Sequence, residues 1–121
     1  MKMNLVTIGS VALSELKIPQ INVFPFYDIE QFFSCRLGVR ALSGFLCDSQ
    51  IDLKNIREIK RCFPTVPILV ICENYDLLRS IDLLRAGADD LIYPSTNRQD
   101  SLNRIFIRLD IMESFMPMYA R

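Results

Sequence analysis

The chain contains no histidine and no tryptophan, and its cysteines Cys35, Cys47, Cys62 and Cys72 form no C-x-x-C pair. A structural zinc site needs thiolate or imidazole ligands at short spacing, so this composition argues against one, and we expect no metal or other cofactor. Isolated cysteines are commonly buried as small apolar side chains. Reduced thiols are typical of the cytoplasm, and we expect the protein there.

An excess of charge of either sign is also absent. The 14 basic and 14 acidic residues are mixed along the chain, so no polybasic stripe can neutralise nucleic-acid phosphates or bind an anionic membrane. No apolar run is long enough to span a bilayer. The N-terminal residues 1–16 have one feature of a signal peptide, a lysine before apolar residues, but Asn4, Thr7 and Ser10 interrupt the run. We therefore expect no direct nucleic-acid partner and no membrane insertion.

Half of the 121 residues are hydrophobic, which suits a single domain spanning residues 1–121. Its most informative part is residues 65–95, which predict a strand, a helix and a second strand. Residues 66–72 are nearly all apolar and mostly β-branched, which is typical of a strand buried on both faces of a parallel sheet. Pro67 can stand only at the start of that strand.

A helix is predicted after this strand, with Asp76 as its N-cap and Gly87 as a left-handed residue at its C-terminus. One apolar stripe of this helix is expected to pack on the sheet. The stripe consists of Leu77, Leu78, Ile81 and Leu84. Leu83 falls off it. Residues 91–93 then form a short strand that Pro94 ends, and a helical crossover makes the two strands parallel neighbours.

At this point the chain resembles the receiver domain of bacterial response regulators, through Pro67–Cys72 and through Ala86–Asp90, the segment AGADD. The resemblance implies an α/β fold: a doubly wound, five-stranded parallel sheet of order 2-1-3-4-5. The remaining elements follow from it. Strands are expected at residues 4–8, 21–26 and 42–47, and helices at 10–16, 28–36, 53–62 and from 99 onward.

The resemblance also implies where phosphotransfer residues would stand, and most of them are missing. A working receiver holds a divalent ion through an acidic pair after its first strand, where this chain has residues 9–11 (Gly-Ser-Val). Cys72 replaces the hydroxyl residue after the fourth strand. The lysine position after the fifth strand falls on Pro94, beside Tyr93. Only Asp48, at the position of the phosphoacceptor, is retained.

Two interpretations of Asp48 remain open. It is either a phosphorylatable aspartate or a loop or helix-cap carboxylate, and without its metal ligands or lysine an aspartyl phosphate would form slowly. Asp89 and Asp90 also resemble an acidic pair, but they lie at the amino end of the fifth strand, opposite the usual site. We assign them a structural role.

The last helix carries two apolar stripes. The first is expected to cover the sheet and consists of Leu102, Ile105, Phe106, Leu109, Met112 and Met116. The second, Ile107, Ile111 and Phe115 flanked by Arg104 and Arg108, falls on the opposite side. Receiver domains often dimerise through their fourth helix, fifth strand and fifth helix. This second stripe therefore predicts a partner site, unless the C-terminal tail folds back over it.

The sequence thus predicts a degenerate receiver, or pseudo-receiver, that is not an enzyme and works as a protein-interaction and dimerisation module, binding itself, another protein or both. Such domains occur in atypical response regulators and at the start of the TadZ and CpaE group of ATPases, which place pilus assembly machinery at the cell pole. The second setting suggests a role in localising pilus or secretion machinery. The alternative is a phosphoacceptor receiver of an atypical two-component regulator that uses Asp48.

Overall fold

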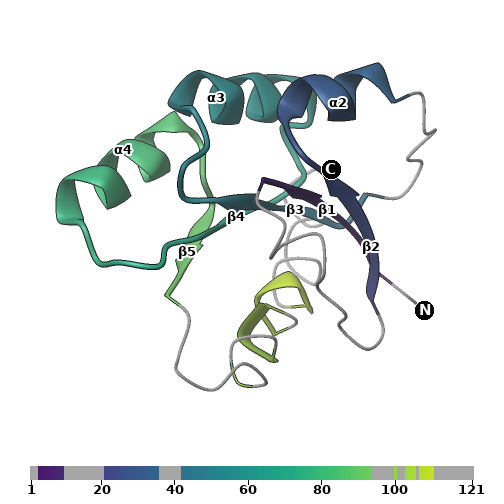
Figure 1. Cartoon of the computed structure of the whole chain (residues 1–121). Coiled ribbons are helices and arrows are strands. Elements are labelled where there is room, and N and C mark those ends of the chain that lie inside the picture. The colour runs from purple at the N-terminus through teal and green to yellow at the C-terminus, as the bar shows by residue number, and fades with distance from the viewer. Residues whose placement is uncertain are drawn as a thin grey trace.

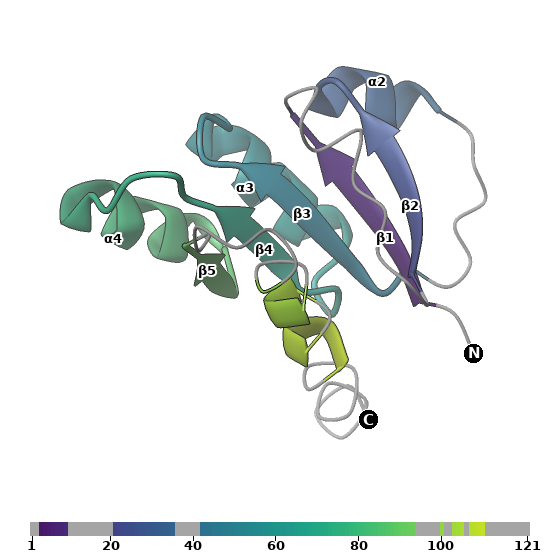
Figure 2. The same ribbon diagram turned by 60° about the horizontal axis from the view of Figure 1, so that its bottom comes forward.

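The computed structural model describes residues 3–9, 21–35, 42–93, 100, 103–105 and 107–110. In them, parallel strands form one sheet of order β2-β1-β3-β4-β5, which confirms the predicted fold (Figures 1 and 2). The strands are β1 (Met3–Ile8), β2 (Ile21–Phe26), β3 (Gly44–Asp48), β4 (Ile68–Ile71) and β5 (Asp90–Ile92). The helix expected at residues 10–16 lies outside the described part of the chain.

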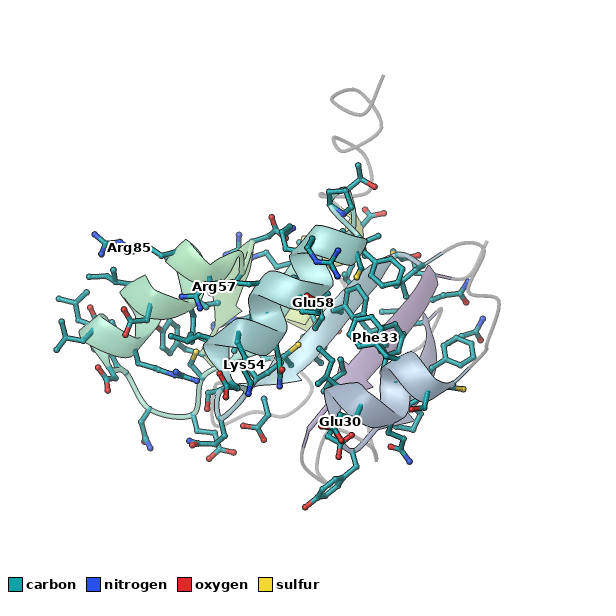
Figure 3. The ribbon with its side chains drawn as sticks, turned by 90° about the horizontal axis from the view of Figure 1, so that it is seen from above. Glu30, Phe33, Lys54, Arg57, Glu58 and Arg85 are labelled. Carbon is teal, nitrogen blue, oxygen red and sulfur yellow. The ribbon has the colours of Figure 1, made fainter. Side chains whose placement is uncertain are left out.

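Helices cover both faces of this sheet. The helices α2 (Ile29–Ser34), α3 (Leu53–Cys62) and α4 (Leu77–Ala86) lie side by side on one face, as Figure 3 shows from above. The helical residues 103–105 and 107–110, which we call the C-terminal helical segment, lie on the other face (Figure 2). Among the described helices, none is long and apolar enough to cross a membrane.

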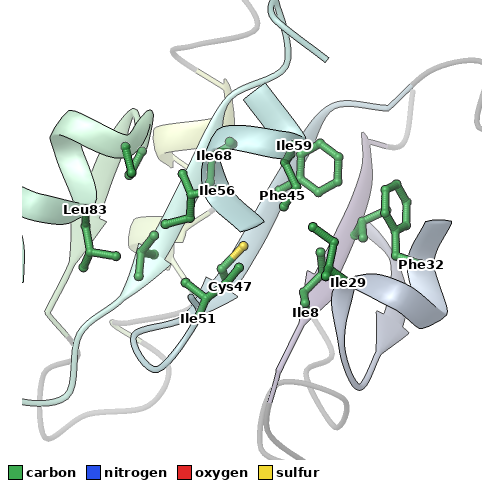
Figure 4. Close-up of a cluster of buried hydrophobic side chains, with 14 of the residues drawn as sticks. Ile8, Ile29, Phe32, Phe45, Cys47, Ile51, Ile56, Ile59, Ile68 and Leu83 are labelled. Atoms are coloured by element: carbon green, nitrogen blue, oxygen red, sulfur yellow. The ribbon is translucent and has the colours of Figure 1, made fainter. Parts of the chain in front are cut away.

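The alternation of side chains along the strands builds a core on each side of the sheet. Val6, Ile68 and Val70 point toward α2, α3 and α4, where they join Phe45 in the larger cluster (Figure 4). Leu46 points the other way and packs with the C-terminal helical segment. All of these side chains are fully buried in adjacent parallel strands, and for Ile68 and Val70 this confirms the burial predicted for residues 66–72.

Polar side chains cap the helices, and Asp76 and Gly87 bound α4 where the sequence predicts. The carboxylate of Asp28 accepts a hydrogen bond from the backbone N of Gln31 at 2.8 Å, and that of Asp76 accepts one from Arg79 at 3.1 Å. Gly87 ends α4 with a φ of 128°, a region that favours glycine. Local polar chemistry therefore sets the helix limits.

The buried side of α4 differs from the prediction. Ser80, Leu83 and Ala86 face the sheet, and Leu83 has no exposed surface, whereas the predicted stripe points largely outward. The exposed fractions in that stripe are 57% for Leu77, 75% for Leu78 and 48% for Leu84, and Ile81 is only half-buried. The physical reason is the short sheet edge beneath α4. The strands β4 and β5 have only four and three residues, so the narrow side of α4 that carries Ser80, Leu83 and Ala86 is enough to cover them.

The turn before β5 is structural, as predicted. Oδ2 of Asp89 accepts hydrogen bonds from Nζ of Lys60 and from the backbone N of Ile68, both at 2.7 Å. The backbone N of Asp89 in turn donates to the carbonyl of Ile68 at 2.8 Å. The next residue, Asp90, pairs with Arg108 at 3.0 Å and so ties the C-terminal helical segment to β5.

Candidate functional site

A pocket of about 340 Å³ opens at the carboxyl ends of β1, β2 and β3, the end of a parallel sheet at which ligands bind. Ile8, Ile29 and Ile51 supply its apolar part and appear in the lower part of Figure 4. Its polar lining comes from the end of β3, the loops that follow β2 and β3, and the first turn of α3. These polar residues are Tyr27, Asp28, Asp48, Gln50, Asp52 and Asn55.

Asp48 is the last residue of β3 and is half-buried at the rim of this pocket. Its Oδ1 accepts a hydrogen bond from the backbone N of Gln50 at 3.0 Å, and its carbonyl accepts one from the N of Ile51 at 3.0 Å. The carboxylate therefore stabilises its own turn, as expected of a loop aspartate. It is not the cap of α3, because Asp52 fills that position.

The end of β1 carries no carboxylate in the described residues. Gly9 follows Ile8, donates its N–H to the carbonyl of Phe26 at 3.0 Å and leaves the strand with a φ of 139°. Besides Asp48, the pocket lining contains two acids, Asp28 and Asp52, and both accept hydrogen bonds from helix N–H groups. Within the described residues, no three acidic, thiol or imidazole groups are placed to share a metal ion. The donor set therefore does not fit the divalent ion of a working receiver.

Cys72 directly follows β4 and is buried, and its backbone N donates to the carbonyl of Ile92 at 2.9 Å. Burial raises the pKa of its thiol, and the positive charge of Arg79 opposes this only in part. A protonated, buried thiol is a poor donor to a phosphoryl oxygen. Cys72 thus packs with the core at the position where the receiver resemblance implies a hydroxyl.

Arg79 joins α4 to the loop that follows Asp48. Its Nη2 donates to the carbonyls of Ser49 at 2.8 Å and Ile51 at 2.6 Å, and its Nε donates to Ser49 at 3.3 Å. These bonds bring a positive charge beside the candidate phosphoacceptor loop. They use backbone oxygens, and among the residues that the structure describes this charge has no carboxylate partner.

Tyr93 follows β5 and turns its hydroxyl toward α4. The hydroxyl lies 2.6 Å from Oγ of Ser80, which also lies 2.8 Å from the carbonyl of Asp76. Because a carbonyl only accepts, Ser80 donates its single proton to Asp76, and Tyr93 is the donor to Ser80. The ring of Tyr75 lies against that of Tyr93, with centroids 5.8 Å apart. The predicted lysine position, Pro94, lies outside the described residues.

The predicted interface residues of the last helix are described only in part. Ile105 and Leu109 are buried against the sheet, as predicted for the first stripe, and Ile107 points outward with 52% of its surface exposed. Arg104 pairs with Asp100 at 3.3 Å. The interface residues Ile111 and Phe115 lie outside the described residues, as do Leu102, Phe106, Met112 and Met116 of the first stripe.

Sequence reasoning found Asp48 but missed three side chains around it. Neither Asp28 nor Asp52 was predicted to lie at this site, although both follow β2 or β3 and the order β2-β1-β3 brings those strand ends together. Arg79 lies outside the predicted apolar stripe of α4, and nothing in its spacing shows that it reaches the loop after β3. The predicted strand order could have indicated that the two acids lie at this site, but no feature of the sequence indicated Arg79.

No family model and no curated protein sequence matches the chain, but solved structures do. NtrX from Brucella abortus, crystallised with ATP, has a TM-score of 0.79 at 16% identity over 99% of this chain, which spans 29% of NtrX. A CheY-like response regulator receiver domain protein from Methanospirillum hungatei has a TM-score of 0.74 at 17% identity, with 94% of this chain and 98% of that one covered.

A pilus assembly-related protein from Burkholderia pseudomallei is also similar, with a TM-score of 0.72 at 17% identity over 91% of this chain and 90% of that one. Identities this low show the fold alone. The described chain has the five-stranded fold of CheY-like receiver domains.

Proposed function

We propose that the chain is a pseudo-receiver that does not transfer phosphoryl groups and serves as a protein-interaction and dimerisation module. The observation that carries this proposal is the set of residues at the strand ends around Asp48. They are Gly9 after β1, Cys72 after β4 and Tyr93 after β5. None supplies a carboxylate or an ammonium group, and phosphoryl transfer to an aspartate needs charge stabilisation from such groups.

The interaction role is supported by apolar side chains left outside the core on and beside α4. Large apolar side chains are exposed on α4 and on the loop before it, and one more is exposed on the C-terminal helical segment. They are Tyr75, Leu77, Leu78, Leu84 and Ile107, which we call the α4 patch. Burying one such side chain fully stabilises a complex by about 1.5–3 kcal/mol, so a covering surface would be favourable.

The proposed occupant of this patch is a second copy of the chain, packed through α4 and the C-terminal helical segment. An interface between two identical patches matches apolar surface with apolar surface, as a two-fold dimer requires. The buried free thiols Cys47 and Cys72 support a cytoplasmic location. A role in positioning pilus or secretion machinery is the setting we propose, in keeping with the fold of the Burkholderia protein.

Sedimentation over a concentration series tests the dimer. Leu78→Glu places a charge in the α4 patch and should shift the protein toward monomer while far-UV circular dichroism stays unchanged. Tyr27→Glu is the matched control, because Tyr27 is 73% exposed and Leu78 75%, but Tyr27 follows the opposite edge strand β2. A wild type that stays monomeric, or equal dissociation in both variants, would remove the homodimer.

Incubation with acetyl phosphate and magnesium tests the loss of phosphotransfer. We expect the intact mass of the protein to stay unchanged. The second candidate function, a phosphoacceptor receiver, is favoured by the position of Asp48 at the pocket rim. A gain of one phosphoryl group in the wild type that is lost in Asp48→Ala would establish it and overturn the pseudo-receiver.

A further inference from the structure

A second pocket, of about 550 Å³, lies beside the loop from β3 to α3, and cationic side chains from two helices line it. Lys54 and Arg57 come from α3 and Arg79 comes from α4. Asp52 is the carboxylate in the lining, and it is occupied in capping α3. Three cations and one carboxylate leave a local charge of +2 in a chain whose formal net charge is zero.

Arg79 is the fixed member of this cationic set. Its Nη2 and Nε are held by the carbonyls of Ser49 and Ile51 at 2.6 to 3.3 Å, so the guanidinium plane has one orientation. Nη1 makes no hydrogen bond to any residue that the structure describes. It is therefore available as a donor to a ligand, and its direction is set before the ligand arrives.

Lys54 and Arg57 are the free members. They stand three positions apart on α3, where residues are neighbours on one side of a helix. Figure 3 shows Arg57 on the side of α3 that faces α4 and Lys54 near the start of α3. Neither side chain has an ion pair or hydrogen bond with another residue in the described ranges, whereas Lys60 and Arg61 on the same helix are both paired.

We propose that this pocket binds a small molecule through a phosphoryl group. A phosphoryl monoester carries a charge close to −2 at neutral pH, which complements the local charge of the lining. Its three free oxygens can each face one of the three cations, while a carboxylate has only two oxygens and a single charge. The pocket is much larger than one phosphate, so the remainder of a small ligand fits within it.

This site adjoins the Asp48 pocket along the same loop but has a different charged lining. Gln50, Ile51 and Asp52 line both pockets, but the three cations line only the second. The proposal therefore rests on the three cations and requires no phosphorylation of Asp48. Arg79 links α4 to this loop, so a ligand bound to Arg79 would restrain both α4 and the loop.

Binding can be measured on the whole chain by two-dimensional amide NMR, with inorganic phosphate and pyrophosphate as probes at ionic strength held constant with chloride. Saturable shifts are expected at Gln50, Ile51 and Arg57, with a dissociation constant in the millimolar range or tighter. Sodium acetate at the same ionic strength should give no saturable shift. Absence of saturable phosphate and pyrophosphate binding, or equal binding of acetate, would overturn the proposal.

Arg57→Gln should weaken phosphate binding by about tenfold, because it removes a charge-assisted donor. Arg85→Gln is the matched control: Arg85 is also exposed and unpaired among the described residues, but it lies at the far end of α4, outside the pocket (Figure 3). We expect that control to change affinity by less than about twofold. Equal weakening in both variants would mean nonspecific attraction and would reject the site.

Discussion

Truncating Leu83 tests most directly which side of α4 faces the core. Leu83 is fully buried in the larger core cluster, and Leu78, on the same helix, is 75% exposed. Leucine-to-alanine changes in cores cost about 2–5 kcal/mol. Because α4 covers a short sheet edge that can partly collapse, we expect Leu83→Ala to lower the free energy of unfolding by about 2–3 kcal/mol. Leu78→Ala should change it by less than about 0.5 kcal/mol.

Urea unfolding followed by far-UV circular dichroism measures both variants. A loss of this size lowers the unfolding midpoint by roughly 1–2 M urea for a small domain and should leave the slope of the transition unchanged. Unfolding should be measured at a protein concentration at which the wild type is monomeric, because dimer formation would also stabilise the folded protein. If Leu78→Ala costs as much as Leu83→Ala, the outward orientation of the Leu78 side of α4 is wrong.

Three further perturbations have defined outcomes. Asp89→Ala should lower the free energy of unfolding in urea by about 1–3 kcal/mol, because it leaves the N–H of Ile68 without its side-chain acceptor. Glu58→Ala removes an exposed ion pair with Arg61 and should cost clearly less. Equal costs would refute the structural role of Asp89. Gly87→Ala should destabilise by about 1 kcal/mol or more, since alanine disfavours a φ of 128°, and an unchanged thermal midpoint would contradict this. Burial raises the pKa of the Cys47 thiol to about 12 from 9.0, so Cys47 and Cys72 should resist labelling by a maleimide in the folded protein, and rapid labelling of all four cysteines would refute their burial. The contribution of the Cys47 thiol to stability is complete below pH 9 and falls as pH rises toward 12.

Much of the fold was predictable because its signals are local. The β-branched run at β4 and the helix-end residues Asp76 and Gly87 each depend on a few neighbouring residues, and each is found where it was expected. The strand order followed from the receiver resemblance, and it agrees with the crossover rule for parallel strands. Local chemistry and chain topology together account for the sheet.

The orientation of α4 could not be predicted in the same way. Counting apolar residues selects the stripe that contains Leu77 and Leu78, but the buried side includes Ser80, whose polarity hides its role. Ser80 is tolerated there because its hydroxyl bonds both Asp76 and Tyr93. Those partners lie on the turn before α4 and after β5, so the burial of Ser80 depends on tertiary contacts that no periodicity encodes.

The reciprocal bonds between Asp89 and Ile68 also set the alignment of an edge strand. With only three residues, β5 has little hydrophobic pattern of its own, and a slip by one residue would turn its side chains to the wrong faces. The two bonds fasten β5 to the start of β4 one residue before the first ladder pair, Leu69 with Asp90. This alignment sets the position of Tyr93, the residue after β5. The Asp89 carboxylate at one end of the sheet therefore determines that Tyr93 contacts α4 at the other end.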